Sequence, residues 1–424
     1  MRRSKAGFYR LLMVLVVVTA AELCSRGALF ALEKWRRVYY HPVPFKLTET
    51  GRTVIQAFIN DESPNTKLDA ALGWAPKPSK TVRFAGSDPK TETISPQGIR
   101  GNRIYSLAPN QGIVRIAAFG DSYTFGSAVS DDECWTEVMS LGEQAVEVLN
   151  FGVAGYGLDQ AFLRYQEEGA PFHPHVVLIC YMTENLARHV NVFPAFYMHV
   201  QTMPVSKPRF VVERGALRLL GNPLRTPKDY QELLHHERES LTMLGQNDYF
   251  YRRSARPAKI DALGMVRLVK VIRRIVERAH SVGSLYERGY YNTDSEAFKV
   301  TVRLIEEFDE AVLRNGSAPV VVIFPHRGDI DRHRMDGSKS YQPLLEHLTR
   351  AGMEPVDLME ALQSAARSRE VPALFDSEGG GHYSPLGNEI VAEHLLKCLE
   401  KRELLDVDTM VVTPRIRTAE VGIE

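Results

Sequence analysis

The chain has 424 residues, of which 44% are hydrophobic and 25% are charged, and its 52 basic residues are balanced by 52 acidic ones. This composition is ordinary for a globular protein, and the length allows two or three domains. The balance of positive and negative charge gives no reason to expect nucleic acid as the main partner. The four cysteines lie far apart without a CxxC pair that would indicate zinc.

The first predicted element is an apolar helix at the N-terminus. The basic stretch "MRRSKAGFYR" precedes residues 11–21, "LLMVLVVVTAA", which are too few to cross a bilayer that takes about 20 residues. The longer span 8–32 can cross if Glu22 and Arg26 are paired or lie near an interface. We interpret residues 1–37 as an uncleaved signal-anchor with its N-terminus in the cytoplasm. A cleaved signal peptide and a buried helix of a soluble protein are the alternatives.

A change of pattern follows this apolar segment. Residues 38–110 hold many Pro, Gly, Lys and Thr residues without long periodicity, which predicts an irregular lead-in packed on the main domain. From residue 111 onward, short apolar runs alternate with helical stretches, and this alternation is typical of a doubly wound α/β domain. Continuous apolar runs predict strands buried on both faces of a parallel sheet. The five predicted strands are 113–119, 145–151, 175–181, 319–324 and 353–358.

The main domain is predicted to cover residues 111–405, with an insertion at about 186–293 between the third and fourth strands. The insertion contains a turn signal at residues 214–215, which predicts a hairpin, and a basic amphipathic stretch at 265–278. We interpret this stretch as a helix with a solvated basic face, and contact with anionic lipid headgroups is the alternative. Residues 406–424 are predicted to form a loosely ordered tail.

The stretch "FGDSYTFG" places Ser122 where the first strand of the sheet should pass into a helix. Such a turn exposes a side chain, and the helix N-terminus supplies backbone N–H groups and the positive end of a dipole. A serine nucleophile also needs a base, usually a histidine, which in turn needs an orienting carboxylate.

A second stretch, "FDSEGGGHYSPLGNE", carries the residue types that this serine would need. It places Asp376, Glu378 and His382 in a glycine-rich loop just before the closing helix. Loops of this kind can cluster at the carboxyl ends of the strands, where doubly wound sheets bind ligands. No spacing in the chain indicates a metal site, and we expect no cofactor.

These stretches resemble the signature blocks of the SGNH (GDSL) hydrolase superfamily. "FGDSYTFG" resembles the first block, "NFGVAGYGLDQ" (150–160) the second, and the loop around His382 the last, while "LGW" (72–74) and "GIRGNR" (98–103) resemble a membrane-anchored bacterial branch. The resemblance implies a flavodoxin-like sheet of five parallel strands in the order 2-1-3-4-5. It also implies ester hydrolysis or acyl transfer through an acyl-serine.

The resemblance assigns a role to each matching position. Ser122 would be the nucleophile and His382 the general base, and Gly155 would donate a backbone N–H to the oxyanion together with Ser122. The third block of the family normally reads G-x-N-D, where this chain has "YMTENLARH". Counting along the strand leaves Thr183, Glu184 or Asn185 at that place. Asn185 is the only amide donor among them, so we expect Asn185 to complete the oxyanion hole.

The last block also departs from the family pattern. The family places a carboxylate three residues before the histidine, and Gly379 stands there in this chain. A glycine-rich loop can fold Asp376 back to His382, so we predict Asp376 as the orienting residue. Glu378 and a Ser–His dyad without a carboxylate are the alternatives.

Together the patterns predict a membrane-anchored serine esterase or acyltransferase. The expected substrate is an ester of a cell-envelope carbohydrate, with an O-acetyl ester as the first candidate, and the domain would face the periplasm or the cell exterior. One alternative is a non-catalytic or weakly active binding or assembly module at the membrane. The other is a lipid-directed esterase or thioesterase.

Overall fold

Five strands form one parallel sheet at the centre of the protein, in the order β6-β5-β7-β12-β13. Numbered along the chain, this order is 2-1-3-4-5, so the predicted fold class is confirmed. The strands are β5 (Val114–Phe119), β6 (Val146–Asn150), β7 (Val176–Met182), β12 (Ala318–Phe324) and β13 (Val356–Asp357).

Helices pack on this sheet in two groups. In the first group, α4 packs against β6 and α15, and α15 packs against α14; in the second, α5 and α11 contact each other and also β5, β7 and β12. Every residue of β5, β7 and β12 is buried, as the continuous apolar runs predict. The helices concerned are α4 (Trp135–Ser140), α5 (Leu158–Arg164), α11 (Glu296–Arg314), α14 (Met359–Ser368) and α15 (Pro385–Lys401).

Two predicted elements are shorter in the structure. The fifth strand has only two residues instead of six, because Pro355 has no N–H to donate to a neighbouring strand. The helix expected after the first strand is divided into a 3₁₀ turn, η1 (Asp131–Glu133), and α4, because Cys134 between them has an extended backbone.

The lead-in contains regular structure instead of the irregular structure predicted for it. α2 (Glu49–Ile59) begins at Thr48, whose hydroxyl accepts a hydrogen bond from the N–H of Gly51 at 3.0 Å. Two antiparallel hairpins follow, and these short strands lacked a signal because each has only four or five residues. They are β1 (Thr66–Asp69) with β2 (Gly73–Pro76), and β3 (Lys80–Phe84) with β4 (Lys90–Ile94).

The predicted hairpin of the insertion is confirmed. β8 (Arg209–Glu213) pairs with β9 (Ala216–Leu220), and the two turn residues have positive φ angles of 52° and 80°. Both angles are those of the tight turn that suits the twist of a hairpin. A second hydrophobic cluster joins the insertion to the lead-in; it includes Trp74, Phe193 and Tyr230.

The other helices and strands complete the insertion and the C-terminal part. The helices are α6 (Asn185–Arg188), α7 (Pro227–His235), α8 (Glu237–Gly245), α9 (Tyr249–Ser254), α10 (Gly264–Ala279), α12 (Arg327–Asp336) and α13 (Gln342–Arg350). The short helix at the first strand's end is α3 (Ser122–Phe125), and the remaining strands are β10 (Tyr286–Glu287) and β11 (Tyr290–Tyr291). Single turns are η2 (Tyr165–Gly169), η3 (Ala170–Phe172), η4 (Pro194–Phe196), η5 (Lys259–Ala262) and η6 (Val371–Leu374).

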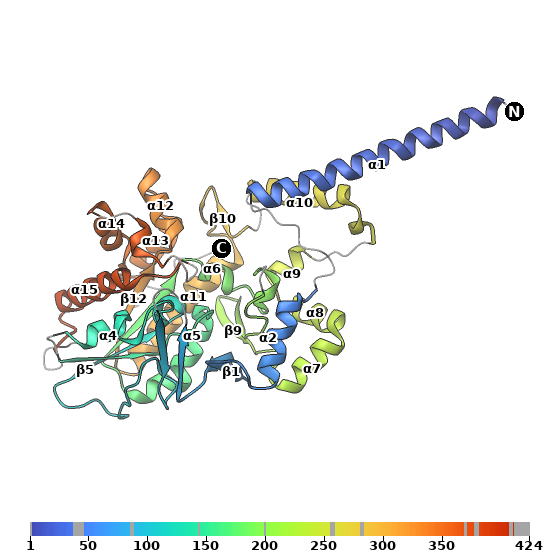
Figure 1. Cartoon of the computed structure of the whole chain (residues 1–424). Helices are drawn as coiled ribbons and strands as arrows, with labels where there is room; N and C mark the ends of the chain where they lie inside the picture. Colours follow the sequence, from blue (N-terminus) through green and yellow to red (C-terminus); the bar gives the residue numbers. More distant parts are fainter. Residues whose placement is uncertain are drawn as a thin grey trace.

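The N-terminal helix α1 (Arg2–Arg36) projects away from the rest of the protein (Figure 1). Its segment Gly7–Lys34, 28 residues long, is apolar and long enough to cross a membrane. A membrane anchor and a signal sequence both fit this helix. Arg26 donates a hydrogen bond to Glu22 at 2.8 Å, the pairing that a membrane crossing would require of these two charges.

This computed structural model describes residues 2–36, 46–84, 89–142, 145–198, 201–254, 259–279, 284–368, 371–376, 381–406 and 410. The predicted tail lies almost wholly outside the described residues, as does Glu378.

Candidate functional site

Ser122 is the first residue of α3, directly after the buried strand β5 and the turn at Gly120. The Oδ1 atom of Asp121 accepts a hydrogen bond from the N–H of Tyr123 at 2.9 Å and so caps the helix. At Gly120, a Cβ atom would lie 2.8 Å from the carbonyl oxygen of Cys180, so the turn requires glycine. The glycine and the aspartate of the G-D-S motif therefore suit this sharp strand-to-helix turn.

The C-terminal loop brings His382 to this serine. The Nε2 atom of His382 lies 2.9 Å from the Oγ atom of Ser122, although 260 residues separate them. The hydroxyl of Tyr123 donates to the carbonyl oxygen of Gly381 at 3.0 Å, and the Tyr123 ring lies 5.2 Å from the imidazole. Tyr123 therefore connects α3 directly to the histidine loop.

Asp376 contacts the histidine loop through its backbone. Its N–H donates to the carbonyl oxygen of His382 at 2.8 Å, while its Oδ1 atom lies 3.1 Å from the Nζ atom of Lys90 on β4. Among the residues that the structure describes, Lys90 is the partner of the Asp376 carboxylate, and the imidazole is not. The alternative carboxylate, Glu378, lies outside the described residues.

The loop after β6 packs closely against α3. The side chain of Asn150 donates to the carbonyl oxygen of Thr124 at 2.8 Å and accepts from the N–H of Gly152 at 2.9 Å. At Gly152, a Cβ atom would lie 2.4 Å from the backbone nitrogen of Phe125, so no larger residue fits. The N–H of Val153 donates to the carbonyl oxygen of Gly120 at 3.1 Å and joins the two loops.

Gly155 ends this loop with a positive φ angle of 84°. The indole of Trp74 donates to the carbonyl oxygen of Ala154 at 3.0 Å and packs over Gly155, where a Cβ atom would lie 3.2 Å from the ring. Neither the N–H of Gly155 nor that of Ser122 donates a hydrogen bond to any described residue. Both donors therefore stay available to another acceptor.

Asn185 is the first residue of α6, directly beyond the end of β7. Its side chain is fully buried, yet neither its amide nitrogen nor its amide oxygen has a partner among the described residues. By contrast, the hydroxyl of Thr183 donates to Asp329, and Glu184 lies 3.8 Å from the Nε2 atom of His326. A buried amide without a partner is costly, which is the usual sign of a functional constraint.

A buried ion pair lies beside α3. The Nη1 atom of Arg188 is 3.1 Å from Asp121 and donates to the carbonyl oxygen of Tyr156 at 2.6 Å. Burial raises the pKa of the Asp121 carboxyl, and the Arg188 guanidinium opposes this shift. Arg188 thus fixes the turn that carries Ser122, a structural role that the sequence did not reveal.

His189 lies in the interior of the protein. Its Nε2 atom accepts a hydrogen bond from the N–H of Leu158 at 3.2 Å, and its Nδ1 atom lies 2.7 Å from the hydroxyl of Thr301. Burial holds the pKa of His189 well below its ordinary value, so the imidazole is neutral. This residue belongs to the core and not to the Ser122 site.

Two residues of the lead-in hold the site in place, and sequence reasoning noted their motifs without assigning them a role. Trp74, in "LGW", supports the loop of Gly155, as described above. Arg100, in "GIRGNR", packs its guanidinium 4.6 Å from the ring centre of Phe125 and donates to the carbonyl oxygen of Val129 at 3.0 Å. Both are buried, and both contact the loops around Ser122 from outside the sheet domain.

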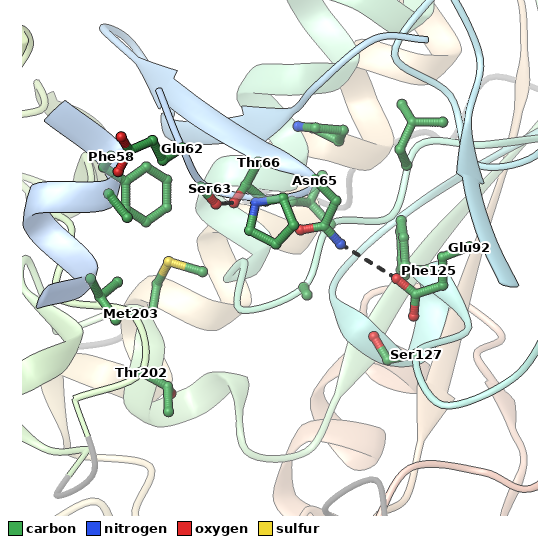
Figure 2. Close-up of a pocket in the computed structure, with 17 residues that line it drawn as sticks. Phe58, Glu62, Ser63, Asn65, Thr66, Glu92, Phe125, Ser127, Thr202 and Met203 are labelled. Carbon is green, nitrogen blue, oxygen red and sulfur yellow. Dashed lines mark hydrogen bonds between the residues drawn. The ribbon is translucent and has the colours of Figure 1, made fainter. Parts of the chain in front are cut away.

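A cavity of about 350 Å³ lies next to these loops, between the lead-in and the residues 202–203 of the insertion (Figure 2). Val153 and Ala154, directly before Gly155, belong to its wall, but Ser122 and His382 do not line it. Figure 2 shows the side chain of Asn65 donating to Glu92, at 3.4 Å. The polar lining residues are Glu62, Ser63, Asn65, Thr66, Glu92, Ser127 and Thr202.

Within the described ranges, no group of three or more His, Cys, Asp or Glu side chains could hold a metal ion. The groups that the structure brings together around Ser122 are its hydroxyl, the imidazole of His382 and backbone amides. Those groups are the ones that acyl transfer through a serine uses.

Comparison with known proteins gives similarities to solved structures alone. No protein-family model matches the chain, and no curated protein does. A putative lipolytic protein of the G-D-S-L family from Desulfitobacterium hafniense is 13% identical; the match covers 67% of this chain and 98% of that chain, with a TM-score of 0.35. A member of the lipolytic G-D-S-L family from Veillonella parvula is 12% identical, with coverages of 68% and 98% and a TM-score of 0.33. A lipase/acylhydrolase from Enterococcus faecalis is 15% identical, with coverages of 68% and 97% and a TM-score of 0.32.

Proposed function

We propose that the protein is a serine esterase or acyltransferase in which Ser122 forms an acyl-enzyme intermediate. The observation that carries this proposal is the distance of 2.9 Å between the Oγ atom of Ser122 and the Nε2 atom of His382. A hydroxyl at a helix N-terminus in hydrogen-bond contact with an imidazole is the arrangement that activates a serine nucleophile.

In the first half-reaction, the Oγ atom of Ser122 attacks the ester carbonyl carbon while the Nε2 atom of His382 takes the hydroxyl proton. The C–O bond of the ester then breaks, and the imidazolium returns that proton to the leaving alcohol. In the second half-reaction, His382 takes a proton from water or from an acceptor hydroxyl, whose oxygen attacks the acyl carbon. The ester bond to Ser122 then breaks, and the imidazolium returns the proton to the Oγ atom of Ser122. Water gives hydrolysis, and a sugar hydroxyl gives acyl transfer.

The developing oxyanion needs hydrogen-bond donors. The backbone N–H groups of Ser122 and Gly155 are two candidates, since neither donates to a described residue. The amide of Asn185 is the third, and its lack of a partner supports this role. One such donor contributes about 3 kcal/mol to transition-state stabilisation.

An orienting carboxylate for His382 completes the proposal. We keep Asp376 in this role, because its N–H already holds the backbone of His382 at 2.8 Å. Its carboxylate would have to leave Lys90 and rotate toward the ring. Glu378 is the competing residue, and a dyad would be slower because nothing would fix the imidazole tautomer.

We further propose that the substrate is an ester of a cell-envelope carbohydrate, for example an O-acetyl ester. The cavity beside Gly155 supports this choice, because its lining of hydroxyl, amide and carboxyl groups with Phe58 and Phe125 suits a sugar ring. The apolar helix α1 supports a membrane-bound protein. We place the domain on the periplasmic or outer side of that membrane.

A binding or assembly module without turnover is the second candidate function. The specific observation that favours it is the ion pair between Asp376 and Lys90, which leaves the described carboxylate away from the imidazole. In that case a Ser122→Ala variant would keep the full cellular function.

The test is labelling of the full-length protein in detergent with a fluorophosphonate probe, which reacts with activated serines. Wild type should label, whereas Ser122→Ala and His382→Ala should not. Ser106→Ala, an exposed serine outside the site, is the matched control and should label normally. Equal labelling of all four proteins would overturn the proposal. The rates of labelling of Asp376→Asn and Glu378→Gln should also be compared. The variant that labels more slowly would identify the orienting carboxylate.

A further inference from the structure

The N-terminal helix α1 consists of two parts with different surroundings. Every residue from 7 to 20 is exposed, so no part of the described protein packs against this segment. From residue 21 onward, one face of the helix is partly or fully buried, because it packs along α10 (Figure 1). The partly or fully buried residues of this part are Ala21, Glu22, Ser25, Ala28, Leu29, Ala31 and Leu32.

Glu22 marks the boundary between the two parts. Its Oε1 atom accepts a hydrogen bond from the N–H of Gly264 at 2.7 Å, and its Oε2 atom accepts one from the N–H of Met265 at 3.1 Å. These N–H groups begin α10 and have no partner inside that helix. A carboxylate of the apolar helix therefore caps a helix of the insertion, 242 residues away.

Gly264 allows the close contact between the two helices. A Cβ atom at this position would lie 2.8 Å from the Cγ atom of Arg26 and 3.2 Å from the Oε1 atom of Glu22. Small residues have the same function at helix contacts within membranes, where they let two backbones approach. Glu22, Arg26 and Gly264 thus form one contact, which we call the clasp.

The length of α1 places the clasp at the edge of a bilayer. A hydrocarbon core takes about 20 helical residues, and about 20 residues counted from Gly7 end near Arg26. The clasp then lies within one turn of the boundary between hydrocarbon and headgroups. With a rise of about 1.5 Å per residue, Arg267 lies roughly 4.5 Å and Lys270 roughly 9 Å farther along α10. Both are close to the depth of the headgroup layer, which is about 5–8 Å thick.

The surface of this segment has the chemistry of a membrane-contacting helix. Four large apolar side chains of residues 260–273 are exposed: Ile260 by 58%, Leu263 by 42%, Val269 by 65% and Ile272 by 49%. In addition, the sequence of α10 contains five basic residues and one acidic residue, although the whole chain is neutral. Arg267 and Lys270 are partly buried, and Arg273 is exposed. Apolar and basic side chains within one such segment are typical of helices that contact anionic lipid.

We propose that residues 260–273 form a second membrane-binding element, which the clasp holds at the foot of α1 and which binds the headgroups of anionic phospholipids. Ile260 and Leu263 enter the interface, and Arg267 and Lys270 lie among the phosphates. The lipid is favoured over a protein partner because this surface continues directly from the apolar surface of α1. The element fixes the distance of the Ser122 site from the bilayer, and it does not depend on the proposed chemistry.

The test is amide hydrogen exchange of the full-length protein in nanodiscs of phosphatidylcholine alone or with phosphatidylglycerol. Exchange of residues 260–273 should be slower in the anionic nanodiscs. In Arg267→Gln/Lys270→Gln, this additional protection should fall about fivefold for each charge removed, and salt should weaken it in the wild type. The charge-matched control is Arg314→Gln/Lys397→Gln, two exposed residues of α11 and α15, which should behave as wild type.

The clasp is tested in the neutral nanodiscs. Glu22→Gln removes the charge that caps α10, so the first turn of α10 should exchange faster there, whereas Glu33→Gln, an exposed glutamate of the same helix, should have no effect. Unchanged thermal unfolding of the variants would show that they are folded. Equal exchange in both lipid compositions, or equal losses in the control, would overturn the proposal; protection by an added soluble protein instead of lipid would indicate a protein partner.

Discussion

Single residues decide whether the site around Ser122 is a catalytic one, and Asn185 is the most informative of them. Its amide is buried and has no partner among the described residues, so it costs stability in the absence of a ligand. A group that serves function at the expense of stability can be recognised experimentally, because its removal lowers activity while stability stays the same or rises.

We therefore expect Asn185→Ala to lose activity without losing stability. The rate of fluorophosphonate labelling should fall by about 10²–10³, the usual effect of removing one oxyanion donor. The thermal midpoint should stay the same or rise, because an unsatisfied buried amide is removed. Labelling kinetics and thermal unfolding of one preparation measure both. A variant that labels normally but unfolds at a lower temperature would mean that Asn185 is structural.

His189 gives the protein an acid-sensitive stability. Burial holds its pKa well below the ordinary value of 6.5, so it stays neutral in the folded state while the unfolded chain takes up a proton below that pH. Protons then favour the unfolded state, and the free energy of unfolding falls by about 1.4 kcal/mol per pH unit as the pH drops below about 6.5. His189→Gln should show a shallower decrease between pH 6.5 and 5 in denaturant titrations. Equal slopes for both proteins would contradict this.

At the scale of elements, the loop after β5, the loop after β6 and the loop of His382 meet at the carboxyl ends of the strands. Glycines allow the close approach of these loops. Gly120 and Gly152 each have backbone atoms where a Cβ atom would stand. Gly155 differs, because its positive φ angle of 84° is itself unfavourable for other residues.

Gly155→Ala should therefore lower both stability and activity. The backbone strain costs about 1–2 kcal/mol, and contact with Trp74 would move the N–H that we assign to the oxyanion. Gly352→Ala is the matched control, since Gly352 has a φ angle of 73° and open space around it. Both variants should lose similar stability in thermal unfolding, but only Gly155→Ala should lose labelling, at least about tenfold. Loss in both would indicate a general effect of strain.

At the scale of the whole molecule, the insertion is joined to the sheet domain by a buried ion pair. Lys207 of the insertion pairs with Asp159 of α5, and their side chains are 1% and 0% exposed. Burial lowers the pKa of Lys207, and the Asp159 carboxylate opposes this shift. Each partner forms a further hydrogen bond. Lys207 donates to the carbonyl oxygen of Pro208, and Asp159 accepts from the N–H of Gln160.

Removing one partner of this pair should be costly, and removing both should not. Lys207→Met leaves Asp159 buried without a counter-charge, and we expect a loss of about 3–5 kcal/mol in the free energy of unfolding. Lys207→Met/Asp159→Leu should recover most of this loss, because no buried charge remains. Chemical denaturation of wild type, Lys207→Met, Asp159→Leu and the double variant gives the coupling energy between the two residues. Additive losses in the double variant would show that the pair does not connect the two parts.

The sequence by itself determined the parallel α/β sheet, because continuous apolar runs need burial on both faces and they alternate with helices. The strand order came from the resemblance of the motifs to a known family. It also placed Ser122 at a strand end and His382 in a loop before a helix, since glycines and capping residues act locally. It did not predict the hairpins of the lead-in, whose strands are too short to carry periodicity.

Only the tertiary structure decided which of these groups meet. The 2.9 Å contact between Ser122 and His382, the pairing of Asp376 with Lys90, and the capping of α10 by Glu22 each join residues more than 200 positions apart. Such contacts depend on how the whole chain packs, and no local pattern of residues encodes them. The same holds for Asn185, whose amide lacks a partner only because of what surrounds it in the folded protein.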